Sequence, residues 1–222
     1  MTRLLLAIVG LGVLASVSPS TLIAFVALLA SRKPKSNGIG FLVGWNVSLV
    51  VVFTLCYGAG KTTLSTLHTD GHAAACIVEV VLGAVFVGLA ARAWWRRDHQ
   101  EKVWQASKKL SADLASLRPW QAAILGVLEQ PWTLTALAAV VVVSHRAGPL
   151  AVVLAFVLFS TLSTAAVIVI FVYSSVRSDV AETRLDDIKG RLVRMGPIAT
   201  AVLSALVGAA LIAVGVFGLV TN

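Results

Sequence analysis

The sequence contains few charged residues. Only 13% of its 222 residues are Asp, Glu, Lys or Arg, whereas 58% are hydrophobic. A soluble domain of this length needs far more polar surface than that. Several apolar runs approach or exceed the roughly 20 residues that span a bilayer. The composition therefore predicts an all-α polytopic membrane protein.

Acidic residues are the scarcest charged type, ten against 18 Lys and Arg, which gives a net charge of +8. In a membrane protein, clustered cations more often mark cytoplasmic loops than a nucleic-acid surface, so no nucleic-acid partner is expected. The two cysteines, Cys56 and Cys76, lack zinc spacing. Both fall near the outer ends of neighbouring apolar runs, which allows a disulfide, but two buried thiols are the preferred interpretation.

Recognisable enzyme chemistry is also missing. The chain shows no nucleophile–base pair and no clustered metal ligands, so we expect no enzyme activity, no cofactor and no metal. The sequence "HTDGH" at 68–72 alternates His and Asp, but a short turn around Asp-Gly is more typical of a solvated loop than of a metal site.

The apolar runs predict six transmembrane spans. Their approximate bounds are 4–30, 39–60, 73–93, 121–144, 148–173 and 196–220. The first run resembles a signal peptide, but cleavage after Ser18 would leave a remainder too short to cross the bilayer, so we interpret it as a retained span. The predicted organisation is a three-helix membrane half at 1–95, a cytoplasmic amphipathic linker at 96–120 and a second three-helix half at 121–222.

The positions of the cations predict the orientation. The loops after spans one, three and five carry 15 of the 18 Lys and Arg. The positive-inside rule then places these loops in the cytoplasm and both termini outside a plasma (inner) membrane. Within the linker, Val103, Leu110, Leu114 and Leu117 recur at helical spacing. This pattern fits an amphipathic helix on the cytoplasmic leaflet, and a solvated connector is the alternative. The loop at 177–194 fits a short hairpin or helix.

A weak internal repeat relates the two halves. The first span contains "PSTL" at 19–22 and the fourth contains "PWTL" at 131–134, while "LGA" at 82–84 and "VGA" at 207–209 fall in the third span of each half. Because each half has an odd number of spans, the two halves must be inverted relative to each other. Inverted repeats with broken helices are typical of secondary transporters.

The two proline breaks predict a shared central site. A proline inside a span frees a backbone carbonyl, which lipid cannot satisfy. The candidate substrate or coupling residues are Ser18, Pro19, Thr21, Asn46, Glu129, Gln130, Pro131 and Thr133. Glu129 is the preferred ionisable group, for proton coupling or substrate contact, unless it lies at the cytoplasmic interface. Glu79 is a weaker candidate. Asn46 is expected mainly to hydrogen-bond between helices, and Gly40 and Gly44 to allow close helix packing.

The stretch "YGAGKTT" at 57–63 looks like the end of a nucleotide-binding loop. That loop requires a glycine five positions before Gly60, where this chain has Leu55, and it follows a strand. The predicted orientation also places Lys61 outside the cell. We therefore interpret the stretch as the outer end of a membrane helix.

The segment "SPSTLIAFVALLASRKPKSNGIGFLVGW" at 18–45, with the apolar half that follows "EQPWTL", resembles the Sap/GAP family. These are sulfolipid-addressing and peptidoglycolipid-addressing proteins of mycobacteria and their relatives, within the lysine-exporter-like superfamily. The resemblance implies an inner-membrane protein that moves envelope glycolipids outward. Relatives tend to carry an Asn-Pro-Lys-like second break, where this chain has Gln130-Pro131-Trp132. Thiol-transferring members have cysteines where this chain has Ser18 and Gln130, which argues against redox transfer.

The leading hypothesis is a transporter, or a transport accessory, for export of cell-envelope (glyco)lipids. Its partners would be membrane lipids, including the lipidic substrate, and it allows lipid-biosynthesis or export proteins and a homo-oligomer as further partners. One alternative is a proton-coupled exporter of a small amino acid or cation. The other is a membrane scaffold that recruits a lipid synthase.

Overall fold

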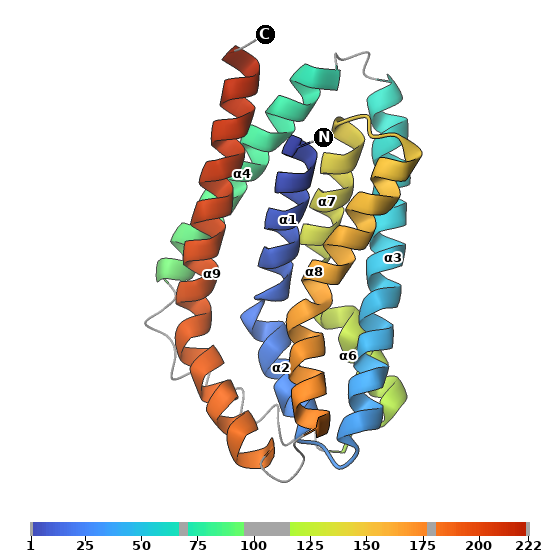
Figure 1. Cartoon of the computed structure of the whole chain (residues 1–222), viewed down its shortest axis with the longest axis vertical. Helices are drawn as coiled ribbons and strands as arrows, with labels where there is room; N and C mark the ends of the chain where they lie inside the picture. Colours follow the sequence, from blue (N-terminus) through green and yellow to red (C-terminus); the bar gives the residue numbers. More distant parts are fainter. Residues whose placement is uncertain (1, 67–70, 96–115, 177–180, 221–222) are drawn as a thin grey trace.

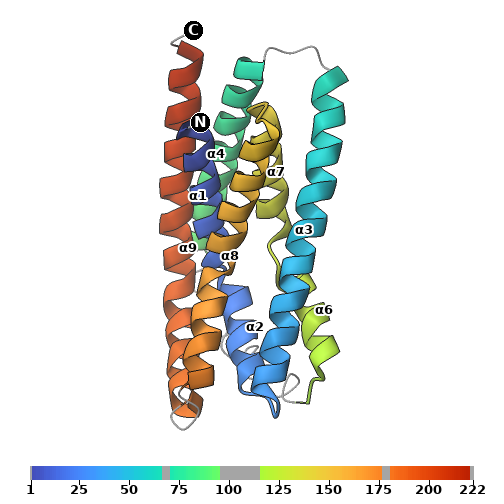
Figure 2. The same ribbon diagram turned by 45° about the vertical axis from the view of Figure 1, so that its right-hand side comes forward.

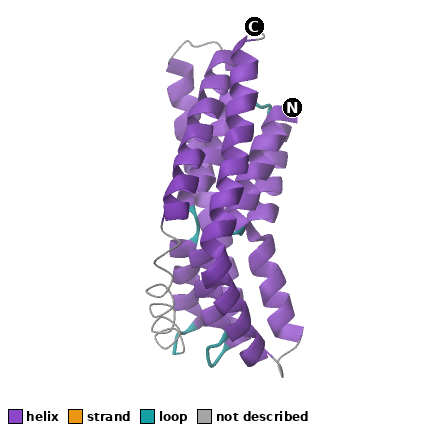
Figure 3. Ribbon diagram, turned by 90° about the vertical axis from the view of Figure 1, so that its left-hand side faces the viewer, coloured by secondary structure: helices purple, strands orange, loops and turns teal. Residues whose placement is uncertain are grey.

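The computed structural model describes residues 2–66, 71–95, 116–176 and 181–220. These residues form helices joined by short turns, and no strand occurs among them, so the predicted all-α class is confirmed (Figure 3). The helices are α1 (Thr2–Ser16), α2 (Pro19–Leu29), α3 (Pro34–Thr66), α4 (Gly71–Trp95), α6 (Pro119–Glu129), α7 (Trp132–Ser144), α8 (Pro149–Val176) and α9 (Ala181–Val220). Most of the predicted linker, residues 96–115, lies outside the described residues.

Several of the helices are long and apolar enough to cross a membrane. Three qualify alone, at Pro34–Thr62, Pro149–Val176 and Ala201–Gly218. Two bent pairs qualify together, α1 with α2 at 48° and α6 with α7 at 55°, which raises the number of candidates to five. The protein is therefore a multi-pass membrane protein. The predicted third span is helical as α4 but is not among these candidates, so six spans remain a prediction.

Two helices extend beyond the predicted spans. α9 runs without interruption from Ala181 to Val220, so the polar segment before the last span is helical and continuous with it. α3 begins at Pro34, within the basic turn, and continues past the predicted end of the second span. It includes all of "YGAGKTT", which is confirmed as helix and not as a phosphate-binding loop. The same helix contains Cys56, which forms no disulfide with Cys76.

The helices stand side by side as one elongated bundle (Figures 1 and 2). α2 continues below α1, and α7 continues above α6, so that each bent pair covers most of the bundle's length. α4 packs along α9, α3 along both α6 and α7, and α1 along α8. The turns before α3 and α6 and the start of α9 lie at one end, and α1 begins at the other. The described turns before α3 and α6, which carry Arg32, Lys33 and Arg118, thus lie at the same end of the molecule as the start of α9.

The core is built around α2, which is enclosed by protein. Every residue from Thr21 to Leu29 is buried, and the ring of Phe25 lies 4.9 Å from that of Phe41 in α3. Neighbouring helices must approach closely to enclose it, and glycines allow this. A Cβ on Gly44 would lie 1.9 Å from the carbonyl oxygen of Ala123 in α6. In lipid, where the hydrophobic effect does not drive helix association, such small-residue contacts hold helices together.

Candidate functional site

Both helix breaks have the same local cause. Ser18 precedes Pro19 and has an extended backbone, with ψ at 112°. Gln130 precedes Pro131 and is also extended, with ψ at 131°. The ring of a proline clashes with a helical conformation at the residue before it. At both breaks the backbone is therefore extended at the residue that precedes the proline. The predicted interruptions at both prolines are confirmed.

The second break leaves backbone carbonyls without their helical partners, and side chains replace them. The carbonyl of Val127 would normally accept from the residue four positions later, but that residue is Pro131, which has no N–H. The indole Nε1 of Trp132 donates to this carbonyl instead, at 2.8 Å. The carbonyl of Glu129, the last residue of α6, accepts from the hydroxyl of Thr21 at 2.9 Å. The break is thus satisfied by protein, as lipid-embedded irregular backbone requires.

The Thr21–Glu129 contact brings the two breaks together. Thr21 lies in the first turn of α2, directly after the first break, and is 1% exposed. Its partner lies at the second break, 108 residues further along the chain. The sequence placed both residues in one site from the repeat alone, and the structure brings them into direct contact.

A buried polar cluster lies beside this contact. Gln130 is 3% exposed, and its side-chain amide donates to the hydroxyl of Thr135 in α7. The hydroxyl of Ser48 in α3 donates to the Gln130 Oε1 at 3.4 Å. Thr135 and Ser48 are themselves buried. The cluster holds the unwound residue between three helical segments, and its polar groups satisfy one another inside an apolar protein.

The first break is joined to the rest of the bundle in a related way. Ser16, the last residue of α1, accepts a hydrogen bond at its hydroxyl oxygen from the backbone N–H of Ala166 in α8, at 3.2 Å. The Ser18 hydroxyl lies 3.3 Å from that of Ser20 and is half-buried. Each break is therefore tied to a long helix from the other part of the chain, the first to α8 and the second to α3.

Other predicted site residues lie elsewhere. Asn46 is exposed on α3, and its amide donates to the Leu42 carbonyl of its own helix at 2.8 Å, so the expected interhelical hydrogen bond of Asn46 is wrong. Thr133 is exposed on α7, away from the cluster. Pro131 is half-buried. Glu129 is half-buried and is the last residue of α6, and the junction of α6 with α7 lies midway along the bundle (Figure 1).

Two further predictions concern residues that lie partly outside the described ones. Glu79 belongs to α4, but its side chain is not among those described, and neither is that of Pro19. Of "HTDGH", residues 68–70 lie outside the described part, and Gly71 begins α4. Among the described residues, no group of three His, Cys, Asp or Glu could hold a metal ion.

Sequence reasoning missed Ser48 and Thr135. A signal for Ser48 was available, because Gly40, Gly44 and Ser48 recur every four residues and so share one face of a helix. The two glycines of that face contact α6, which places Ser48 on the interior side. Asn46 lies two positions away, and two residues turn a helix by roughly 200°, so it points outward.

Comparison with known proteins identifies a family for the chain. No curated protein and no solved structure matches the chain. One family profile does, that of Sap, the sulfolipid-1-addressing protein, and it matches residues 8–217. The matched region includes both breaks and the polar cluster. It covers α2 to α8 completely, and it leaves out only the beginning of α1 and the end of α9. The resemblance predicted from "SPSTL" and "FLVGW" is thereby confirmed, and the chain belongs to the Sap, sulfolipid-1-addressing protein family.

Proposed function

We propose that this protein exports cell-envelope (glyco)lipids, or assists their export, through a site between the two helix breaks. The single observation that carries this proposal is the hydrogen bond from Thr21 to the Glu129 carbonyl. It joins the two discontinuous spans at mid-depth, where transporters of the inverted-repeat type place their substrate and coupling ions. The family's sulfolipid-addressing name supports a lipid as the cargo.

We further propose six spans arranged as two inverted three-helix repeats. If a two-fold axis relates the halves, each helix contact in one half must have a counterpart in which the corresponding helices of the two halves are interchanged. The principal contacts meet this requirement. α1 packs on α8 as α6 packs on α3, α2 contacts α9 as α7 contacts α4, and α1 contacts α7 as α2 contacts α6. The third helices of the two halves, α4 and α9, pack on each other.

The glycines of the two matching motifs support the same relation. A Cβ on Gly83 would lie 2.6 Å from the carbonyl oxygen of Gly208, and a Cβ on Gly208 would lie 2.8 Å from that of Gly83. Residues on a two-fold axis contact their own counterparts, as these two glycines do. The described basic turns, with Arg32, Lys33 and Arg118, lie at one end of the bundle, and this supports termini on the extracytoplasmic side.

Glu129 is the proposed coupling group. Its backbone is fixed by Thr21, while its half-buried side chain is the one carboxylate at either of the two breaks. A carboxylate at this depth is costly unless it titrates or faces a polar path. Since "YGAGKTT" is helical and no nucleotide-binding loop occurs in the described part of the chain, we propose that export draws on an ion gradient or on a separate machine.

The test compares surface lipids between the parent strain, a deletion strain and a deletion strain that expresses Glu129→Gln. We expect the deletion to remove one envelope lipid from the surface extract and Glu129→Gln to reproduce most of that loss at normal protein level. Glu182→Gln, at the far polar end of α9, is the matched control and should restore the parent profile. An unchanged lipid profile in the deletion strain would refute the function. A normal profile with Glu129→Gln alone would refute the coupling role.

A further inference from the structure

A cavity lies away from the breaks, at the end of the bundle where α3 and α7 end and α8 begins. It has a volume of about 640 Å³ and is lined by residues of these three helices and of the turn that joins α7 to α8. The lining residues are Tyr57, Lys61, Val142, Val143, Arg146, Ala147, Pro149 and Val152. It includes the two polar side chains of "YGAGKTT" that reach furthest from the helix. The proposed site between the breaks does not use them.

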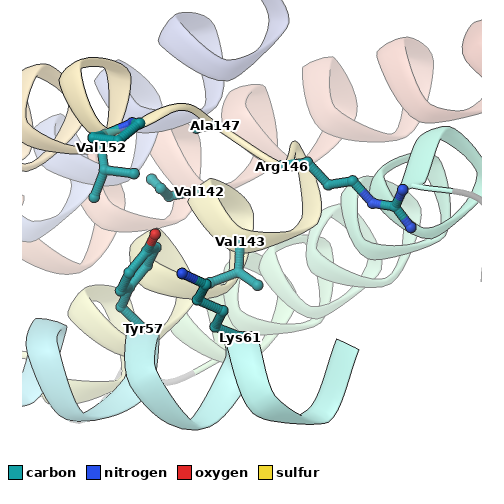
Figure 4. A pocket seen from close by; sticks show the side chains of 8 residues that line it. Tyr57, Lys61, Val142, Val143, Arg146, Ala147 and Val152 are labelled. Atoms are coloured by element: carbon teal, nitrogen blue, oxygen red, sulfur yellow. The ribbon is translucent and has the colours of Figure 1, made fainter. Parts of the chain in front are cut away.

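Tyr57 and Lys61 face the cavity together because they are four residues apart on α3. In Figure 4 the Lys61 amino group and the Tyr57 hydroxyl point to the same side, below Val142 and Val152. Arg146 also lines the cavity, but its guanidinium extends away from the other labelled side chains. The ring of Tyr57 is stacked on that of Phe53, with centroids 6.3 Å apart and planes within 3° of each other. The Tyr57 hydroxyl and the Lys61 amino group thus enter the hollow together, and its other lining residues apart from Arg146 are apolar.

This combination matches an amphiphile with an anionic head. An ammonium and a phenolic hydroxyl both donate hydrogen bonds to phosphate or sulfate oxygens. None of the described lining residues is acidic. The N-terminal turn of α8, which starts at Pro149, adds the positive end of a long helix dipole. The valines of α7 and α8 provide an apolar wall for the first carbons of an acyl chain.

We infer that this cavity is a binding site for the oxyanion headgroup of a membrane lipid, at the end of the protein opposite the basic loops. The inference rests on the proposed lipid function for its occupant, but it concerns a different site. Two sources share this chemistry, a sulfated glycolipid and a phospholipid such as phosphatidylglycerol. On the proposed orientation the site lies at the extracytoplasmic face, where an exported lipid leaves the protein.

The test measures lipid binding to the full-length purified protein by native mass spectrometry. The probes are phosphatidylglycerol, the sulfated glycolipid sulfatide, neutral phosphatidylcholine and, as a water-soluble oxyanion, ATP. We expect at least one of the two anionic lipids to bind more tightly than phosphatidylcholine, and ATP not to bind. A preference between sulfatide and phosphatidylglycerol identifies the source. Equal binding of phosphatidylcholine, or binding of ATP as tight as that of the anionic lipids, would overturn the inference.

Variants locate the bound lipid. Lys61→Gln should weaken anionic-lipid binding by about tenfold, the loss of one charge-assisted hydrogen bond, while Lys61→Arg should keep it. Lys35→Gln removes an equal charge at the opposite end of the bundle and should have no effect. Unchanged binding by Lys61→Gln, or equal losses for the Lys61→Gln and Lys35→Gln variants, would refute the site. Because binding is measured without transport, lipid export could fail in the Glu129→Gln strain while this site remains intact, and the reverse also holds.

Discussion

The close approach of α3 and α6 gives a quantitative prediction for Gly44. A Cβ at this position would lie 1.9 Å from the Ala123 carbonyl oxygen and 2.7 Å from the carbonyl carbon. Both are backbone atoms, so no change of rotamer relieves the overlap. Gly44→Ala therefore requires α3 and α6 to separate by more than about 1 Å, since dispersion contacts need about 3.5 Å.

The separation affects more than one residue. Gly40 and Gly126 meet the opposing backbone in the same seam, with added Cβ atoms at 2.4 Å and 2.2 Å from the carbonyl oxygens of Pro119 and Phe41. Overpacking of a filled interior costs about 1–3 kcal/mol. Ala replacing Gly within a helix gains only about 0.5–1 kcal/mol. We expect a net loss of about 1–2 kcal/mol, which is roughly 5- to 30-fold in the unfolding equilibrium.

Gly58→Ala is the matched control, because it lies on the same helix and a Cβ there meets nothing within 4 Å. We expect Gly58→Ala to be neutral, or to stabilise by up to about 1 kcal/mol. The measurement is unfolding in detergent micelles by increasing SDS fraction, followed by far-ultraviolet circular dichroism. If Gly44→Ala is as stable as Gly58→Ala, the α3–α6 seam is not packed as described. Since α6 ends at the second break, Gly44→Ala should also lower lipid export.

Two further substitutions test the hydrogen bond between the two breaks and the close crossing of α4 and α9. Thr21→Val removes the hydroxyl that donates to the carbonyl at the end of α6, and we expect it to lower the free energy of unfolding by about 1 kcal/mol. Thr161 donates to a carbonyl of its own helix, so Thr161→Val should lower the free energy of unfolding less in the same SDS titration. Equal losses would contradict the role of the Thr21–Glu129 hydrogen bond. Gly83→Ala places a Cβ 2.6 Å from the Gly208 carbonyl and should lower the thermal midpoint measured by circular dichroism, whereas Gly88→Ala, with open space around it, should not. A Gly83→Ala midpoint equal to that of Gly88→Ala would contradict the close crossing.

The positions of the breaks could be predicted because proline acts locally. The steric rule that stops a helix before Pro19 and Pro131 needs no knowledge of the fold. The internal repeat then related the two breaks and led to Thr21 and Gln130. In the structure Thr21 donates to the Glu129 carbonyl at the second break, and Gln130 belongs to the adjacent polar cluster. These predictions depended on a steric clash between neighbouring residues, which is the same whether the helix is surrounded by lipid, protein or water.

The helix faces could not be predicted in the same way. In a soluble helix, polarity separates the interior from the solvent, but here both the interior and the lipid are apolar. Asn46 was therefore assigned to the interior on polarity alone, although it is exposed, while the buried Ser48 was overlooked. Thr133 was predicted to lie in the site but is exposed, whereas Thr135, which was not predicted, is buried in the polar cluster. The extended residues at the break shift the rotational phase of α7, and sequence spacing across a break does not give that shift.

The enclosure of α2 has a consequence for biogenesis. α2 is made well before α9, yet the two helices pack against each other. The side of α2 that α9 covers must face lipid or an insertion factor until α9 has been made, whereas α3, against which Phe25 packs, follows α2 directly. The part of the core around α2 therefore closes only after α9 has been synthesised. A chain that stops before α9 could already form the hydrogen bond from Thr21 to the Glu129 carbonyl, but it would keep an open flank on α2, and that flank gives membrane quality control a feature by which to recognise incomplete copies.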